Sequence, residues 1–256
     1  MALLKVLLLL LGLGVSMNSH VSLHKRIIGG QNCNDTERLY HVRLEGNNGT
    51  HMRLCGGSLI HRQWILTAAH CWKSEPGWTT TAKLGVHPRT ATQEKQIIQH
   101  NPVIYVNKWH YRHDIMLLKL QRPVRNIRPV RLPRCNNRIT IGATVQLAGE
   151  GSTTTSPNNS RSLSASLPPH LQCVDMKVTG FFFTITSGHE FFAEAQNTDV
   201  YFGDSGGGVV FNKKIVGVIS GRGKNFVFRN PVFNMDVCDY LEWIRNTTGL
   251  NKPKIS

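Results

Sequence analysis

Short apolar or alternating runs, separated by glycine, proline and asparagine, follow one another along most of the chain. Runs of this length with turn residues between them are typical of the strands of an all-β barrel or sandwich. Helical spacing occurs at two places, a single turn at 68–72 and the segment 237–247, in which Val237, Tyr240, Leu241 and Ile244 recur. The expected strands are 40–44, 57–60, 64–67, 115–120, 144–148, 171–178, 207–211 and 215–220.

The chain begins differently, with Lys5 before an unbroken apolar run at 6–11 and small residues at Gly12, Gly14 and Ser16. This pattern is typical of a secretory signal peptide and is too short for a spanning helix. We expect the signal peptide to occupy residues 1–19, with cleavage between Ser16 and His20, and the protein to be secreted. No later stretch reaches eighteen consecutive apolar residues, so we expect no membrane span.

The remaining residues are enough for one large all-β domain. No repeat with a solenoid period is present in the sequence. The segment 152–166 is rich in serine, threonine, proline and asparagine, which predicts a surface loop within that domain.

Three short motifs contain a histidine, an aspartate and a serine that could act together. His70 lies in Thr-Ala-Ala-His-Cys at 67–71, Asp114 in His-Asp-Ile-Met-Leu-Leu at 113–118, and Ser205 in Gly-Asp-Ser-Gly-Gly at 203–207. A serine hydroxyl needs a base to take its proton, and an aspartate can orient a histidine for that task. This order along the chain is that of chymotrypsin-type enzymes, distinct from the subtilisin and α/β-hydrolase orders.

Together with Ile-Ile-Gly-Gly at 27–30, Leu-Cys-Gly-Gly-Ser-Leu-Ile at 54–60 and the segment 237–244, these motifs resemble the trypsin-like serine protease family. The resemblance covers nearly everything after residue 26. It implies an all-β fold of two six-stranded antiparallel β-barrels with a C-terminal helix and a catalytic cleft between the barrels. It further implies a serine endopeptidase that hydrolyses polypeptide substrates through His70, Asp114 and Ser205, with Gly203 and Ser205 forming the oxyanion hole.

The family resemblance also implies activation by proteolysis. Cleavage after Arg26 would free the amine of Ile27, which would insert and pair with a buried Asp204. The domain organisation is then a signal peptide at 1–19, an activation propeptide at 20–26 and a protease domain at 27–256. Implied partners are a trypsin-like activating protease, which would suit Lys25 and Arg26, and protein inhibitors; the expected state is a monomer, secreted or stored in secretory granules.

Six cysteines in an exported chain indicate disulfides, and the sequence alone allows fifteen pairings. The resemblance selects three of them: Cys33–Cys173, Cys55–Cys71 and Cys135–Cys238. Neither His-Glu-x-x-His nor a cysteine pair at zinc spacing occurs, so we expect no metal and no other cofactor.

The substrate pocket is where the sequence departs from the family. Asp199, six residues before Ser205, matches the pocket-base aspartate by which trypsins select lysine or arginine. The walls are unusual, because Ser220 is followed by Gly221 and Arg222 where the family has Ser-Trp-Gly, and Val232 stands at the second wall glycine. We expect Arg222 and Val232 to obstruct the pocket. Two hypotheses follow, an endopeptidase with an atypical pocket, and a weakly active or non-catalytic protease-fold binding protein.

The chain carries 30 Lys and Arg against 15 Asp and Glu, a formal net charge of +15, which falls to about +12 when residues 1–26 are removed. Such an excess favours a polyanion such as heparin, or it is evenly spread and serves only solubility. The segments 122–128 and 213–214 are the candidate patches. No nucleic-acid motif is present, so we expect no nucleic-acid partner. The Asn-x-Ser/Thr sites for glycosylation are Asn34, Asn48, Asn158 and Asn246.

Overall fold

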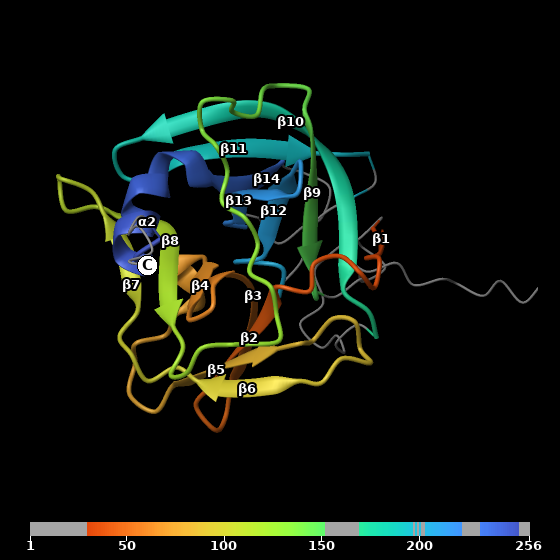
Figure 1. Ribbon diagram of the computed structural model, residues 1–256. Coiled ribbons are helices and arrows are strands. Elements are labelled where there is room, and N and C mark those ends of the chain that lie inside the picture. Colours follow the sequence, from red (N-terminus) through yellow and green to blue (C-terminus); the bar gives the residue numbers. More distant parts are fainter. Residues whose placement is uncertain are drawn as a thin grey trace, which may run out of the picture.

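The computed structural model describes residues 30–151, 169–196, 198, 200, 203–221 and 231–250. Within these residues the chain forms fourteen strands in two sheets and one short α-helix near the C-terminus (Figure 1). Several sequence predictions lie outside the described residues, namely the signal peptide and propeptide, Arg26, Ile27, Asn158, the loop at 152–166, Asp199 and Arg222.

The first sheet is formed by strands from the first half of the chain, in the antiparallel order β6-β5-β2-β3-β4-β8-β7. Its strands are β2 His41–Asn47, β3 Met52–His61, β4 Trp64–Thr67, β5 Thr79–Leu84, β6 Glu94–Ile97, β7 Val103–Val106 and β8 Arg112–Lys119. The edge strands β6 and β7 are joined by only residues 98–102, which include Pro102. The strands β6 and β7 can therefore be regarded as one strand that is interrupted at residues 98–102. Counted in this way, the sheet has six strands and corresponds to the first expected barrel.

The second sheet has the order β1-β10-β11-β14-β13-β12-β9, and a further pairing of β9 with β10 closes it. Its strands are β1 Gln31–Asn32, β9 Thr144–Gly149, β10 Gln172–Thr184, β11 Gly188–Glu194, β12 Gly208–Phe211, β13 Lys214–Ile219 and β14 Val232–Asp236. The closed barrel contains six antiparallel strands, to which β1 is added beside β10. The predicted all-β fold of two barrels is confirmed.

Apolar and polar residues alternate along the strands, which explains how each sheet buries one face. In β10, Val174, Met176 and Val178 are buried, whereas Asp175 and Lys177 between them are exposed. Because successive side chains of a strand point to opposite faces, this period of two directs the apolar residues into the barrel. One apolar cluster lies within the second barrel, and a larger one joins the first sheet to residues of β13, β14 and the C-terminal segment.

The C-terminal segment begins with a 3-10 turn at Val237–Tyr240 and continues as α2 Leu241–Thr248. The four apolar residues recognised by their helical spacing are all buried. Tyr240 and Trp243 both contact the ring of Tyr105 on β7, so the C-terminal segment packs against the first sheet (Figure 1). None of the described helices is both long enough and apolar enough to cross a membrane.

Three disulfides join distant parts of the chain. They are Cys33–Cys173, Cys55–Cys71 and Cys135–Cys238, the same three pairs that the family resemblance implies. The first fastens the chain near β1 to β10, and the third fastens the segment between the barrels to the turn before α2. The second lies at the candidate site.

Candidate active site

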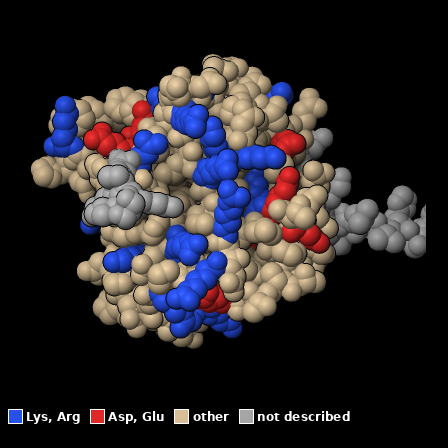
Figure 2. Space-filling view, in the orientation of Figure 1, with Lys and Arg blue, Asp and Glu red and all other residues tan. Residues whose placement is uncertain are grey.

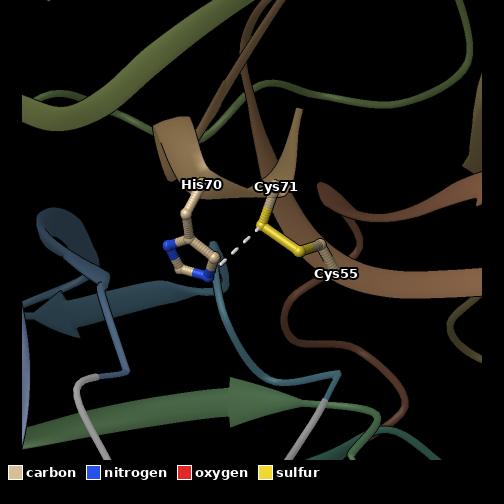
Figure 3. A group of neighbouring side chains, drawn as sticks. All are labelled: Cys55, His70 and Cys71. Carbon is tan, nitrogen blue, oxygen red and sulfur yellow. Dashed lines mark hydrogen bonds between the residues drawn. A yellow bond between two sulfur atoms is a disulfide. The ribbon is translucent and has the colours of Figure 1, made fainter. Parts of the chain in front are cut away.

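His70 lies on a short 3-10 turn, Ala69–Cys71, which directly follows β4. The Cys55–Cys71 disulfide ties this turn to β3, and Figure 3 shows the His70 ring beside the bridge. Ring nitrogen Nε2 lies 4.0 Å from Cys71 Sγ, whereas Nδ1 is bonded to Asp114. The covalent tie thus fixes the backbone that carries the histidine.

Asp114 lies on β8 and accepts hydrogen bonds from two residues. The His70 backbone N–H donates to Oδ1 at 2.8 Å, His70 Nδ1 donates to Oδ2 at 2.8 Å, and Ser220 Oγ donates to the same Oδ2 at 2.5 Å. A carboxylate only accepts hydrogen bonds, so in the neutral form of the ring the proton is on Nδ1 and Nε2 is an acceptor. This is the tautomer that a general base requires.

Ser205 lies on the tight turn that precedes β12. Gly203 and Gly206 in this turn have φ angles of +104° and +80°. A Cβ atom at Gly206 would lie 2.2 Å from Thr67 Oγ1 and 2.5 Å from Gly56 O, so only glycine permits this close approach to the first sheet. The Gly56 N–H donates to Ser205 O at 2.7 Å and holds the turn against β3.

Cys71 contacts both Ser205 and His70. Cys71 Sγ lies 3.6 Å from Ser205 O and 4.0 Å from His70 Nε2. The Ser205 hydroxyl itself faces Gly221, because a Cβ atom at that glycine would lie 2.9 Å from Ser205 Oγ. In the described part of the chain, no hydrogen bond joins Ser205 Oγ to His70. Two of the three expected catalytic side chains are therefore in direct contact, and the hydroxyl of the third faces Gly221.

Comparison with protein-family models matches residues 27–244 to the trypsin family. The chain belongs to this family. It is 33% identical over 262 residues to a trypsin of Xenopus laevis, covering 96% of this chain and 98% of the relative. It is 32% identical over 241 residues to serine protease 1 of Rattus norvegicus, covering 88% and 91%. The solved structure of neuropsin, a serine protease expressed in the limbic system of mouse brain, superposes with a TM-score of 0.68 at 25% identity, covering 86% of this chain and 98% of neuropsin.

In this trypsin-family protein, Asp204 belongs to the same turn as Ser205 and is fully buried. The Gly151 N–H donates to its Oδ1 at 2.7 Å. Asp204 is therefore held at the end of β9, directly next to the residue that would shape the oxyanion hole.

Glu150, the residue before Gly151, is the centre of a buried ion cluster that the sequence analysis missed. Arg43 on β2 binds it with two hydrogen bonds, of 2.8 and 2.6 Å, and Arg89 Nη2 donates to it at 2.6 Å. Burial alone would raise the pKa of Glu150, but His41 and Arg43 outweigh this effect and hold the pKa far below its usual range. The only signal in the sequence was an acidic residue between two glycines at the end of an apolar run.

Two of the four predicted pocket residues lie in the described chain. Ser220 is buried at the end of β13, and its hydroxyl binds Asp114. Val232 begins β14, is buried, and packs in the apolar cluster of the closed barrel. Asp199 and Arg222 lie outside the described residues.

One group of metal-ligand type is found among the described residues, formed by Cys55, His70 and Cys71 (Figure 3). The two sulfurs are bonded to each other, and a disulfide offers no thiolate to a metal. This trypsin-family protein therefore uses these residues to position the histidine turn. Of the predicted glycosylation sites, Asn34 and Asn246 are exposed, Asn48 is half-buried, and Asn158 lies outside the described residues.

Proposed function

We propose that this protein is a secreted serine endopeptidase, made as a zymogen and activated by cleavage after Arg26. The observation that carries the proposal is the hydrogen bond of 2.8 Å from His70 Nδ1 to Asp114, which leaves Nε2 as an acceptor near Ser205. The match of residues 27–244 to the trypsin family supports the same chemistry.

In the proposed reaction, His70 Nε2 takes the hydroxyl proton as Ser205 Oγ attacks the carbonyl carbon of a peptide bond. Asp114 stabilises the imidazolium that forms, and Ser220 holds the carboxylate in place. The N–H groups of Gly203 and Ser205 donate to the developing oxyanion. His70 then gives its proton to the leaving amine, and water releases the acyl group from Ser205 by the same steps.

Activation would form a second contact beneath the oxyanion turn. Cleavage after Arg26 creates a charged amine at Ile27, and the proposed partner of this amine is the buried carboxylate of Asp204. A new ion pair at a fully buried position would set the conformation of Gly203, because breaking such a pair is costly. The same cleavage separates the 20–26 propeptide from the protease domain at 27–256.

The proposed substrate is a polypeptide, with an atypical and partly occluded pocket for the side chain before the cut. Asp199 would favour lysine or arginine, whereas Arg222 and Val232 would obstruct entry. The buried position of Val232 supports its role as a wall that cannot move aside without disturbing the apolar cluster.

A second candidate function is that of a weakly active or non-catalytic protease-fold binding protein. The observation that favours it is the Ser205 hydroxyl, which faces Gly221 and makes no hydrogen bond with His70 among the described residues. In the first proposal the hydroxyl turns toward Nε2 on activation or substrate binding, as catalytic hydrogen bonds often tighten only in the complex.

The first experiment treats the secreted full chain with immobilised trypsin, removes the trypsin, sequences the new N-terminus and measures hydrolysis of an unfolded protein. We expect the N-terminus at Ile27 and hydrolysis only after cleavage. Ser205→Ala should abolish hydrolysis, and the exposed Ser74→Ala should leave it unchanged.

The outcomes separate the two candidates. A new N-terminus at a different residue contradicts the activation step. Hydrolysis that survives in Ser205→Ala contradicts the proposed nucleophile. A correct N-terminus without any hydrolysis supports the binding protein.

A further inference from the structure

A hollow of about 840 Å³ lies between the two barrels and is lined by an unusual set of charges. Five cationic residues line it, Arg62, Arg131, Arg134, Lys214 and Arg245, and no Asp or Glu is among its lining residues. We call these five residues and the space between them the basic hollow. Figure 2 shows Lys and Arg gathered in a band across the face on which the segment between the barrels runs.

The cations of the basic hollow come from four separate segments that the fold holds together. Arg62 lies in the turn after β3, Arg131 and Arg134 in the segment between the barrels, Lys214 at the start of β13, and Arg245 on α2. Backbone hydrogen bonds fix three of these segments, from Val124 N to Arg62 O at 2.8 Å and from Ile215 N to Arg131 O at 3.0 Å. The charges are thus presented by a preorganised backbone.

Several cations outside the basic hollow form ion pairs, whereas the five inside it do not within the described chain. Arg43, Lys83, Arg89, Arg122 and Arg138 each pair with a described carboxylate. None of the five residues in the basic hollow forms an ion pair with a carboxylate in the described chain. The positive charge of the basic hollow is therefore not neutralised by a carboxylate of the described chain.

The site shares only Lys214 with the two segments that the sequence suggested. Arg122, from the first segment, is paired with Glu94, with Nε 3.3 Å from Oε1. Lys213, from the second, is not among the residues that line the basic hollow, whereas its neighbour Lys214 is. Only the tertiary structure brings Arg62 and Arg245 beside Arg131.

The lining indicates which kind of anion would bind. One small anion cannot contact five cations spread over a hollow of this size, whereas a chain with repeated anionic groups can. Four of the five cations are arginines, whose planar guanidinium matches the oxygens of sulfate or phosphate in a bidentate manner. No Phe, Tyr or Trp lines the basic hollow, and His61 is its single ring-bearing side chain, so it lacks the row of stacking surfaces on which single-stranded nucleic acids depend.

We propose that the basic hollow binds a sulfated polysaccharide chain such as heparin. None of its lining residues belongs to the candidate active site, so the chain would bind without occupying the cleft. The proposal does not depend on catalysis.

The test measures binding of a heparin oligosaccharide of defined length to the full chain by calorimetry over a range of salt concentrations. Arg131→Gln, Arg134→Gln and Lys214→Gln are combined in one variant. We expect its affinity to fall at least tenfold and the slope of log K against log salt to fall by roughly two to three, because about three counterion-releasing contacts are lost.

A matched control removes the same charge elsewhere, with Lys95→Gln, Lys108→Gln and Arg112→Gln, three exposed cations that do not line the basic hollow. Its affinity should change by no more than about twofold. A third variant, Arg131→Lys, Arg134→Lys and Lys214→Arg, keeps the charge and should retain most of the binding, which shows that the site tolerates substitution.

Equal losses in the hollow variant and the matched control would overturn the proposal, because the charge would then act diffusely. Tighter binding of double-stranded DNA than of heparin of equal charge would overturn it in favour of a nucleic-acid site. Loss of binding in all three variants, with unchanged thermal unfolding, would also contradict a site defined by charge.

Discussion

Asp114 is the residue on which the orientation of His70 depends, and it is itself held by Ser220. Its Oδ2 accepts hydrogen bonds from both His70 Nδ1 and Ser220 Oγ. A hydrogen bond to a charged group contributes about 1.5–3 kcal/mol. Ser220 is thus a positioning residue, which acts on the histidine through the carboxylate.

Removing the Ser220 hydroxyl tests this role. We expect Ser220→Ala to lower kcat by about tenfold to hundredfold while KM changes little, since the lost bond orients the base and does not bind substrate. Ser220→Thr keeps a hydroxyl and should recover part of kcat. Steady-state kinetics of the activated variants test this prediction. A change that appears only as a higher KM, with kcat unchanged, would contradict the positioning role.

The pocket walls give a second prediction for single residues. Arg222→Gly combined with Val232→Ala should raise kcat/KM for arginine and lysine peptides, because both side chains are proposed to obstruct the space above Asp199. Val232→Ala is preferred to glycine because Val232 packs in the apolar cluster. Arg222→Lys serves as the control that keeps a charged side chain. Fast hydrolysis of arginine peptides by the unchanged protein would show that the walls were wrongly predicted.

At the scale of single residues, local motifs were enough to propose His70, Asp114 and Ser205 as candidates but not to predict the contacts around them. The motif around each of them is short and continuous in sequence. Ser220 and Asp114, by contrast, are 106 residues apart, and Glu150 is 107 residues from Arg43. No local pattern specifies pairs of this kind, because the sheets bring them together.

At the scale of elements, the histidine turn depends on the Cys55–Cys71 disulfide. The bridge closes a loop with a sequence separation of 16. A disulfide that closes a loop of this length contributes roughly 3 kcal/mol to the free energy of unfolding. It also keeps the turn against β3, from which Gly56 binds the Ser205 backbone.

Replacing both cysteines, as Cys55→Ser with Cys71→Ser, should lower the free energy of unfolding by about 3 kcal/mol. We also expect a lower kcat at temperatures where the variant is fully folded, since the turn that carries His70 loses its tie. Urea unfolding and kinetics on the same preparation test both effects. An unchanged unfolding free energy would contradict the contribution of the bridge.

Strand predictions succeeded where the apolar pattern was uninterrupted and failed where polar residues are buried or where a strand is mostly exposed. The strand β4 was predicted at its observed bounds, and the helix at 237–247 was confirmed with a 3-10 first turn. The strands β11 and β14 were missed because Glu190 and Asn234 occupy buried positions and break the pattern. Asn234 is accommodated by hydrogen bonds to Val232 O and Phe191 O.

At the scale of the whole molecule, Glu150 links the two barrels behind the oxyanion turn. Arg43 belongs to the first sheet, whereas Glu150 directly follows β9 of the second. Removing one partner of a buried ion pair costs about 3–5 kcal/mol because the remaining charge is left uncompensated. The cluster therefore couples the packing of the barrels to the segment that binds Asp204.

Glu150→Gln should lower the free energy of unfolding at neutral pH by about 3–5 kcal/mol. The folded-state pKa of Glu150 lies well below the value of about 4.3 in unfolded chains, so its stabilisation is complete above that value and is lost as pH falls toward the folded pKa. When the pH is lowered from neutral to below about pH 4, the free energy of unfolding should consequently fall less in Glu150→Gln than in the natural protein. Urea unfolding of both proteins at neutral and acid pH tests this prediction. An equal fall in unfolding free energy for the two proteins would contradict it.

The central claim is that cleavage after Arg26 turns Ser205 into a nucleophile activated by His70. The most direct measurement is labelling with a small fluorophosphonate, which makes little use of the substrate pocket, followed by mass-spectrometric mapping of the modified residue. The account predicts labelling of Ser205 after cleavage, much slower labelling before it, and none in Ser205→Ala or His70→Ala. An unlabelled Ser205 in a chain that begins at Ile27 would contradict it.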